Sequence, residues 1–89
     1  MPYISKYNRV KYEESLKKLD KILSELSNDA VAGEVNFIVT SICKSALSKF
    51  NRYTRYNAII GALECAKLEL YRRQLAAYED QKIEENGDV

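Results

Sequence analysis

Residues 54–83, TRYNAIIGALECAKLELYRRQLAAYEDQKI, constrain the fold more than any other part of this 89-residue chain. The stretch holds no proline, one glycine (Gly61) and many strong helix formers, and it therefore predicts a single long helix. With about 30 residues at about 1.5 Å of rise each, that helix would be about 45 Å long. We expect the shorter remainder of the chain to pack along it.

The apolar residues of this long stretch do not form one stripe. At about 100° per residue they gather on two faces roughly 130° apart, and small residues fill a third side. A helix that is apolar on most sides is normally buried. We therefore expect it to be central in a bundle or covered by a second copy of the chain, which predicts a homo-oligomer. The first face holds Ile59, Leu63, Ala66, Leu70 and Ala77, the second holds Ile60, Leu68, Tyr71, Leu75 and Tyr78, and the third holds Ala58, Gly61, Ala62, Cys65 and Ala76.

Two shorter helical patterns precede the long one. Residues 9–26 carry a single apolar stripe at helical spacing. Residues 30–50 repeat apolar residues with the same period, and their length and lack of turn signals favour a helix over a strand. Residues 27–29, Ser-Asn-Asp, offer N-cap oxygens to the second helix, and Thr54 offers one to the third. The first stripe consists of Tyr12, Leu16, Leu19, Leu23 and Leu26.

The predicted fold is all-α, a three-helix arrangement with a long C-terminal helix in one domain, residues 1–89. Residues 1–8 are predicted to form an extended arm that its large apolar side chains anchor to the bundle. Residues 50–53 are predicted to form a turn. Residues 84–89 are predicted to be a frayed tail, in which Asn86-Gly87 acts as the stop signal for the helix.

The composition excludes several classes of protein. Fourteen Lys and Arg against thirteen Asp and Glu leave a net charge of +1, which argues against nucleic acid or a membrane surface as the partner. The sequence has no apolar run of the ~18 residues that a membrane-spanning helix needs. Its first residues, MPYISKYNRVKYEE, are polar and lack the apolar core of a signal peptide, so we expect a cytoplasmic protein. Cys43 and Cys65 are then expected to be small buried hydrophobes, without a disulfide.

No catalytic or metal site is predicted. The chain has no histidine, which is the commonest general base and metal ligand, and its serines and cysteines therefore lack an activating base. All-helical nucleotide pyrophosphatases hold magnesium with paired E-x-x-E and E-x-x-D motifs. Here Glu34 is followed three residues later by Phe37, and Glu64 by Lys67. We therefore expect a protein that is not an enzyme and needs no cofactor.

Six polar or aromatic residues are candidates for a binding site. Glu64 lies within the second apolar face, where a carboxylate must find a partner or shift its pKa upward. One interpretation is an ion pair with Arg72 or Arg73 of a neighbouring chain, which would help to set the oligomeric state. The other is a ligand site in which the two guanidinium groups hold a phosphate and tyrosine rings stack on a base. The candidate ligand-binding residues are Arg72, Arg73, Tyr71, Tyr78, Glu64 and Asn36.

Phe37 lies away from the main apolar face of the second helix. Such an outward aromatic ring indicates a contact with another chain, although a single exposed aromatic residue needs no special explanation.

Four strings of the sequence together resemble a family of small uncharacterised proteins encoded mainly by bacteriophages and prophages. The family pattern has G-E-hydrophobic-N-aromatic in the second helix and a G-x-L-E-C-x-K-x-E motif followed by R-R in the third. This chain has Leu70 where an aromatic residue often stands and Ala77 where proline often stands, and neither departure removes a chemical group. The resemblance implies a phage origin without implying an activity. The strings are MPYI at 1–4, AGEVNFIVT at 32–40, NAIIGALECAKLELYRR at 57–73 and YEDQKIEENGDV at 78–89.

Three functions are compatible with these observations. The first is a non-enzymatic phage-type interaction protein that binds and blocks a host component, such as a defence protein. The second is an oligomeric sponge that sequesters a nucleotide signal molecule at subunit interfaces lined by Arg72, Arg73 and tyrosines. The third is a virion or assembly accessory protein. The expected partners are accordingly other copies of the chain and a host protein or nucleotide.

Overall fold

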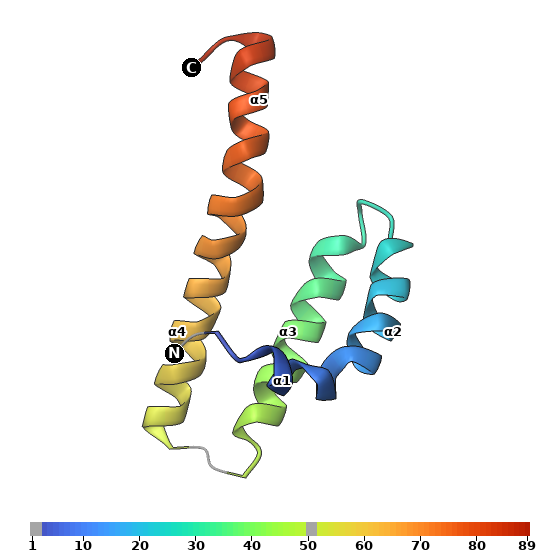
Figure 1. Ribbon diagram of the computed structural model, residues 1–89, viewed down its shortest axis with the longest axis vertical. Helices are drawn as coiled ribbons and strands as arrows, with labels where there is room; N and C mark the ends of the chain where they lie inside the picture. The colour runs from blue at the N-terminus through green and yellow to red at the C-terminus, as the bar shows by residue number, and fades with distance from the viewer. Residues whose placement is uncertain (1–2, 50–51) are drawn as a thin grey trace. The chain divides into compact units, whose positions relative to one another are not determined.

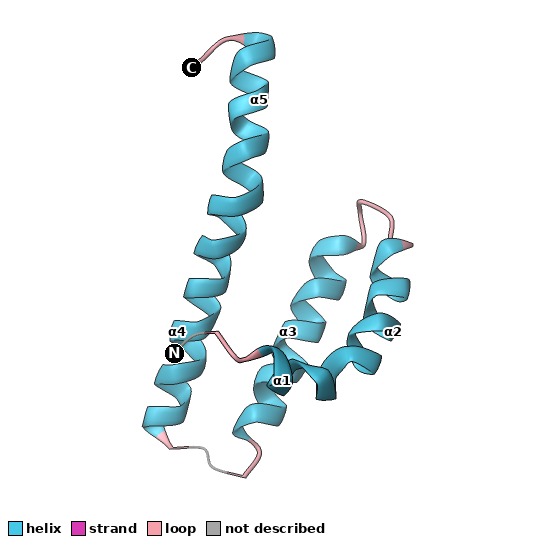
Figure 2. Ribbon diagram, viewed as in Figure 1, coloured by secondary structure: helices cyan, strands magenta, loops and turns pink. Residues whose placement is uncertain are grey.

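The computed structural model describes residues 3–49 and 52–89, and every regular element in these residues is helical (Figures 1 and 2). The predicted all-α class, with three helical segments and a long C-terminal helix, is confirmed. The chain divides into two compact units, Met1–Ser48 and Lys49–Val89. The elements are α1 (Lys6–Arg9), the 3₁₀ turn η1 (Val10–Tyr12), α2 (Glu13–Ser24), α3 (Val31–Leu47), α4 (Tyr53–Leu70), the π-turn η2 (Tyr71–Leu75) and α5 (Ala76–Asn86).

The first helical segment begins earlier than the sequence indicated. Residues 6–8 were expected in an extended arm but belong to α1, because Ser5 caps the helix by accepting a 3.2 Å hydrogen bond from the backbone N–H of Asn8. Arg9 Nε also donates a 3.1 Å bond to the carbonyl of Ile4. The segment ends at Ser24 rather than at residue 26.

The chain reverses direction between α2 and α3 (Figure 1). Ala30 is the N-cap residue of α3, and the expected side-chain cap from residues 27–29 is replaced by a backbone turn in which the Ala30 N–H donates to the carbonyl of Ser27. α3 ends at Leu47, before the predicted end at residue 50, which lies outside the described residues. The half-buried apolar side chains of this unit are Leu19, Leu23, Leu26, Ala30, Ile38, Val39, Cys43 and Leu47.

The second unit is built on the long helix predicted by the sequence. α4, η2 and α5 follow one another without a break and contribute 18, 5 and 11 residues. The helix begins at Tyr53 with Arg52 as N-cap, so Thr54 lies inside it, and residue 53 does not belong to a turn. It ends at Asn86, which places residues 84–86 in the helix rather than in the tail. Gly87 follows with φ of +87°, at the predicted stop signal.

A π-turn interrupts this helix, and the sequence analysis did not expect it. The backbone N–H of Ala76 donates to the carbonyl of Tyr71, five residues earlier, instead of four. A π-turn holds one residue more than an α-turn, so it rotates everything after it by about 100° relative to an uninterrupted helix.

Among residues 3–49 and 52–89 no side chain is fully buried. In the same part of the chain, no helix is both long and apolar enough to cross a membrane.

Candidate functional site

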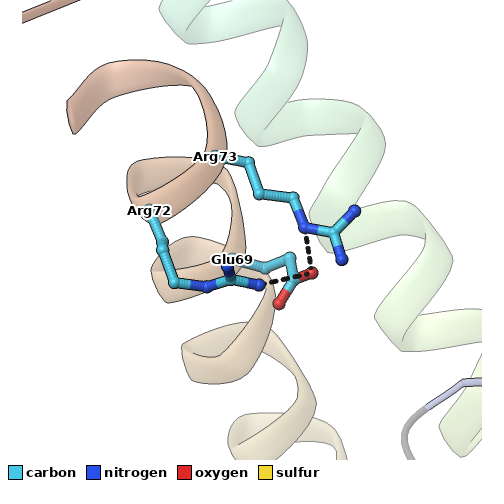
Figure 3. Close-up of polar contacts among 3 residues, drawn as sticks. All are labelled: Glu69, Arg72 and Arg73. Carbon is cyan, nitrogen blue, oxygen red and sulfur yellow. Dashed lines mark hydrogen bonds and ion pairs between the residues drawn. The ribbon is translucent and has the colours of Figure 1, made fainter. Parts of the chain in front are cut away.

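Glu69, at the end of α4, forms ion pairs with both candidate arginines, Arg72 and Arg73 (Figure 3). Its Oε1 lies 2.6 Å from Nε of Arg73 and 3.4 Å from Nη2 of Arg72. The spacing of three and four residues places all three side chains on one side of the helix. Glu69 is only 33% exposed, whereas both arginine side chains are mostly exposed. The sequence analysis missed this role of Glu69, although the i, i+3 and i, i+4 spacing was a signal for it.

This cluster is suited chemically to an anion. Two guanidinium groups and one carboxylate carry a net charge of +1. Each guanidinium has five N–H donors in a fork that matches phosphate or carboxylate geometry, and the contacts with Glu69 engage one nitrogen of each arginine. Glu69 therefore restricts the two side chains while leaving donors for a ligand.

Tyr71 opens the π-turn and is held by Glu79. Its hydroxyl donates a 2.5 Å hydrogen bond to Oε1 of Glu79 in α5. This hydrogen bond is the main reason why the pKa of Tyr71 is raised above its ordinary value, because the carboxylate stabilises the protonated phenol. The charge of Glu79, partial desolvation and the charge of Asp80 raise the pKa further. Tyr71 is therefore a neutral hydrogen-bond donor at physiological pH.

The other candidates of the long helix have separate local partners. Glu64 was expected within an apolar face, but its side chain is 58% exposed and pairs with Lys67 Nζ at 3.0 Å. This ion pair forms because Lys67 lies about one turn after Glu64 on the same side of the helix. Tyr78 lies under the ammonium group of Lys82, which is 5.5 Å from the ring centroid. The structure thus brings Arg72 and Arg73 together, whereas Tyr71, Tyr78 and Glu64 each have their own contact.

Asn36 and Phe37 lie in the first unit, on α3, and both are exposed. The Phe37 ring borders an open groove of about 400 Å³ at the start of α3. Gly33 lies one turn before Phe37, and no heavy atom lies within 4 Å of the point where its Cβ would be. We call this hollow the Phe37 groove, and it is lined by Asp29, Ala30, Gly33, Glu34 and Phe37.

The π-turn also changes which residues share a face of the long helix. Tyr78 was predicted on the second face, and Ala77 on the first. A rotation of about 100° after residue 75 moves Tyr78 into line with Leu70 and takes Ala77 out of line. The Tyr71–Glu79 hydrogen bond agrees with this shift, because its partners are eight residues apart. We call the resulting face the C-terminal stripe, and it consists of Ile59, Leu63, Ala66, Leu70 and Tyr78.

Cys43 and Cys65 are free thiols, as expected. Cys43 is half-buried, but Cys65 is exposed rather than buried.

Comparison with known proteins places the chain in a family. No curated protein and no solved structure matches it. The family model described as Domain of unknown function (DUF6899) matches residues 1–89, and the chain belongs to that family.

Proposed function

We propose that this protein is a non-enzymatic interaction protein of phage type, which binds a host protein in the cytoplasm and blocks it through the Phe37 groove. The observation that carries the proposal is the Phe37 ring, which is 70% exposed beside an open hollow. Aromatic anchors next to pockets supply much of the binding energy in protein interfaces. Phe37 therefore gives this surface an anchor for a partner.

The lining of the groove limits the chemistry of the partner. Asp29 and Glu34 contribute two acidic side chains to the lining, and Ala30 and Gly33 contribute small residues. A segment that presents an apolar side chain with a neighbouring lysine or arginine would complement both features.

Affinity purification from host lysate with three baits tests this proposal. The baits are the wild-type chain, Phe37→Ser and, as a control, Tyr53→Ser, which removes an even more exposed ring from α4. We expect a host protein that the wild type and Tyr53→Ser both retain. Phe37→Ser should bind that purified protein at least about 30-fold more weakly, the effect of losing a hot-spot residue. Equal affinity for the wild type and Phe37→Ser would refute the proposal.

A second candidate function is the nucleotide sponge, and the Glu69 cluster favours it. The cluster fixes two exposed guanidinium groups, whose N–H forks match the geometry of a phosphate group. π-turns within α-helices are also frequent at functional sites.

Thermal unfolding with added nucleotides tests the second function. A nucleotide present at 100 times its dissociation constant stabilises the folded state by about 2.7 kcal/mol. We expect one or more members of a panel of ATP, GTP and cyclic dinucleotides to raise Tm for the wild type and for Lys67→Gln, a control cation on the same helix. Arg73→Gln should lose the response. A panel without effect on the wild type would exclude these ligands.

A further inference from the structure

The C-terminal stripe has the repeat of a helix that pairs with another helix. Leu63 and Leu70 are seven residues apart, Tyr78 follows after eight, and Glu85 after a further seven. Paired helices keep one face in contact through a seven-residue repeat with apolar a and d positions. The π-turn absorbs the single extra residue between Leu70 and Tyr78. The irregular spacing in the sequence is therefore a regular stripe in the structure.

Most of the stripe is exposed, although Ile59 at its start is half-buried. α4, η2 and α5 form one helix, and the described part of the unit Lys49–Val89 has no second helix to cover it. Leu70 is 59% exposed, and Leu63 and Tyr78 are also exposed. Helices in water gain most of their stability by packing such a face.

The charges of this helix oppose its own dipole. Arg52 and Arg55 stand at its start, where the first turn has no acidic residue, and Glu84 and Glu85 stand in its last turn, which has no basic residue. A helix dipole favours the reverse order, with anions at the start and cations at the end. Basic and acidic residues are separated along the whole helix: residues 52–73 hold five basic and two acidic side chains, whereas residues 74–89 hold one basic and five acidic side chains. These charges fit a partner of opposite polarity.

We propose that the partner is a second copy of this chain, packed antiparallel along the C-terminal stripe. In that arrangement Arg55 of each copy lies beside Glu85 of the other. The Glu85 carboxylate also accepts contacts from Lys82 at 3.2 Å and from Gln81 at 3.3 Å within its own helix. The apolar and charged features have nearly the same centre, because the midpoint of Ile59 and Tyr78 falls between Leu68 and Glu69 and that of Arg55 and Glu85 falls at Leu70. A two-fold axis near Glu69 therefore brings both sets close to alignment. A parallel pair would set Arg55 against Arg55.

This surface is separate from the Phe37 groove, so the two proposals fail independently. Neither Phe37→Ser nor a missing host partner affects the self-association expected here.

Mass measurement on the full chain tests the pairing. Native mass spectrometry and light scattering should give about twice the 10.2 kDa of one chain. Leu70→Asn should raise the dissociation constant by at least about 100-fold, because two-fold symmetry removes two apolar contacts from each dimer. Leu68→Asn is the matched control: it changes a leucine of similar exposure on the opposite side of the helix and should leave the dimer intact. A wild-type mass of one chain, or equal weakening by the two variants, would overturn the proposal.

Charge exchange and a distance measurement test the orientation. Arg55→Glu and Glu85→Lys should each weaken self-association by about tenfold, because each change reverses two exposed contacts per dimer. An equimolar mixture of the two variants should regain wild-type affinity, since both contacts are restored in the mixed dimer. Each change also improves the match with the helix dipole, which in Glu85→Lys opposes the loss of the local contacts from Lys82 and Gln81.

A spin label at Thr54→Cys, in a chain with Cys43→Ser and Cys65→Ser, should report about 45 Å between copies, from about 1.5 Å of rise per residue on each side of the axis. A distance under about 20 Å would indicate a parallel pair and overturn the orientation.

Discussion

The Tyr71 hydroxyl donates a 2.5 Å hydrogen bond to Oε1 of Glu79, although eight residues separate the two. In an uninterrupted α-helix, a separation of eight residues turns two side chains about 80° apart, whereas seven residues leave them about 20° apart. The π-turn at Tyr71–Leu75 absorbs one residue and brings the pair into line. The hydrogen bond therefore stabilises the π-turn by connecting its first residue to α5.

Replacing Glu79 should lower the pKa of Tyr71. Glu79→Gln removes the carboxylate that stabilises the protonated phenol, which is the main cause of the raised pKa, whereas Asp80→Asn removes only the smallest contribution. Titration of the phenolate absorbance should show one of the seven tyrosines ionising at lower pH in Glu79→Gln than in the wild type. Asp80→Asn should shift the curve less. Coincident wild-type and Glu79→Gln curves would show that the bond is absent in solution.

The same pair predicts how stability depends on pH. The pKa of Tyr71 is higher in the folded chain than the ordinary tyrosine value of about 10, so the folded state favours the protonated phenol. The contribution of this bond is therefore complete below about pH 10 and is lost as the pH rises through the higher folded-state pKa. Urea unfolding should show a larger loss of stability from pH 9 to pH 11 for the wild type than for Glu79→Gln.

The sequence predicted the helical segments better than the details within them. Periodic apolar residues located the helices, and Asn86-Gly87 located the end of α5, because a positive φ favours glycine. The π-turn was not predicted, because residues 71–75 contain neither proline nor glycine to signal it. The turn consists of one shifted backbone hydrogen bond, from Ala76 to Tyr71, together with the side-chain contact between Tyr71 and Glu79. As a result, Tyr78 and Ala77 were assigned to the wrong faces, because their positions around the helix depend on the π-turn.

The candidate site shows the same limit. Arg72 and Arg73 were selected for their charge, which a sequence displays directly. Glu64 was selected instead of Glu69, because sorting the residues by helical face placed the Glu64 carboxylate among apolar side chains. The ion pairs follow the local rule of three and four residues instead.

Alanine at two helical glycines should separate stability from binding. No heavy atom lies within 4 Å of a Cβ built at Gly33 or Gly61, so each substitution should stabilise its helix by about 0.5–1 kcal/mol. Urea unfolding measures this gain. Gly61 lies on the opposite side of the helix from the C-terminal stripe, and Gly61→Ala should leave self-association unchanged. Gly33→Ala adds a methyl group inside the Phe37 groove and should weaken the host partner despite the gain in stability.

Removing the cap at Ser5 should unravel the start of the first helical segment. The Ser5 hydroxyl accepts the bond from the N–H of Asn8, and its loss in Ser5→Ala should cost about 1 kcal/mol. Amide hydrogen exchange should accelerate in α1, whereas exchange in α5 should stay unchanged. Ser15→Ala, near the start of α2, is the control. Unchanged exchange in α1 would show that Arg9 and Ile4 suffice to hold this turn.

Deleting Gln74 should convert the π-turn into an ordinary α-turn without changing the faces of the helix. The deletion removes the extra residue that the π-turn absorbs, so the residues after the turn keep their register with those before it. Tyr78 should then follow Leu70 after seven residues and stay in the C-terminal stripe, and Glu79 should stay in line with Tyr71. We expect this variant to remain a dimer and to keep the raised pKa of Tyr71. Gln74→Ala, which keeps both the number of residues and the π-turn, should also retain both properties. If the deletion variant is monomeric, or if its Tyr71 titration moves to lower pH while its circular dichroism is unchanged, the register of the helix does not determine this surface.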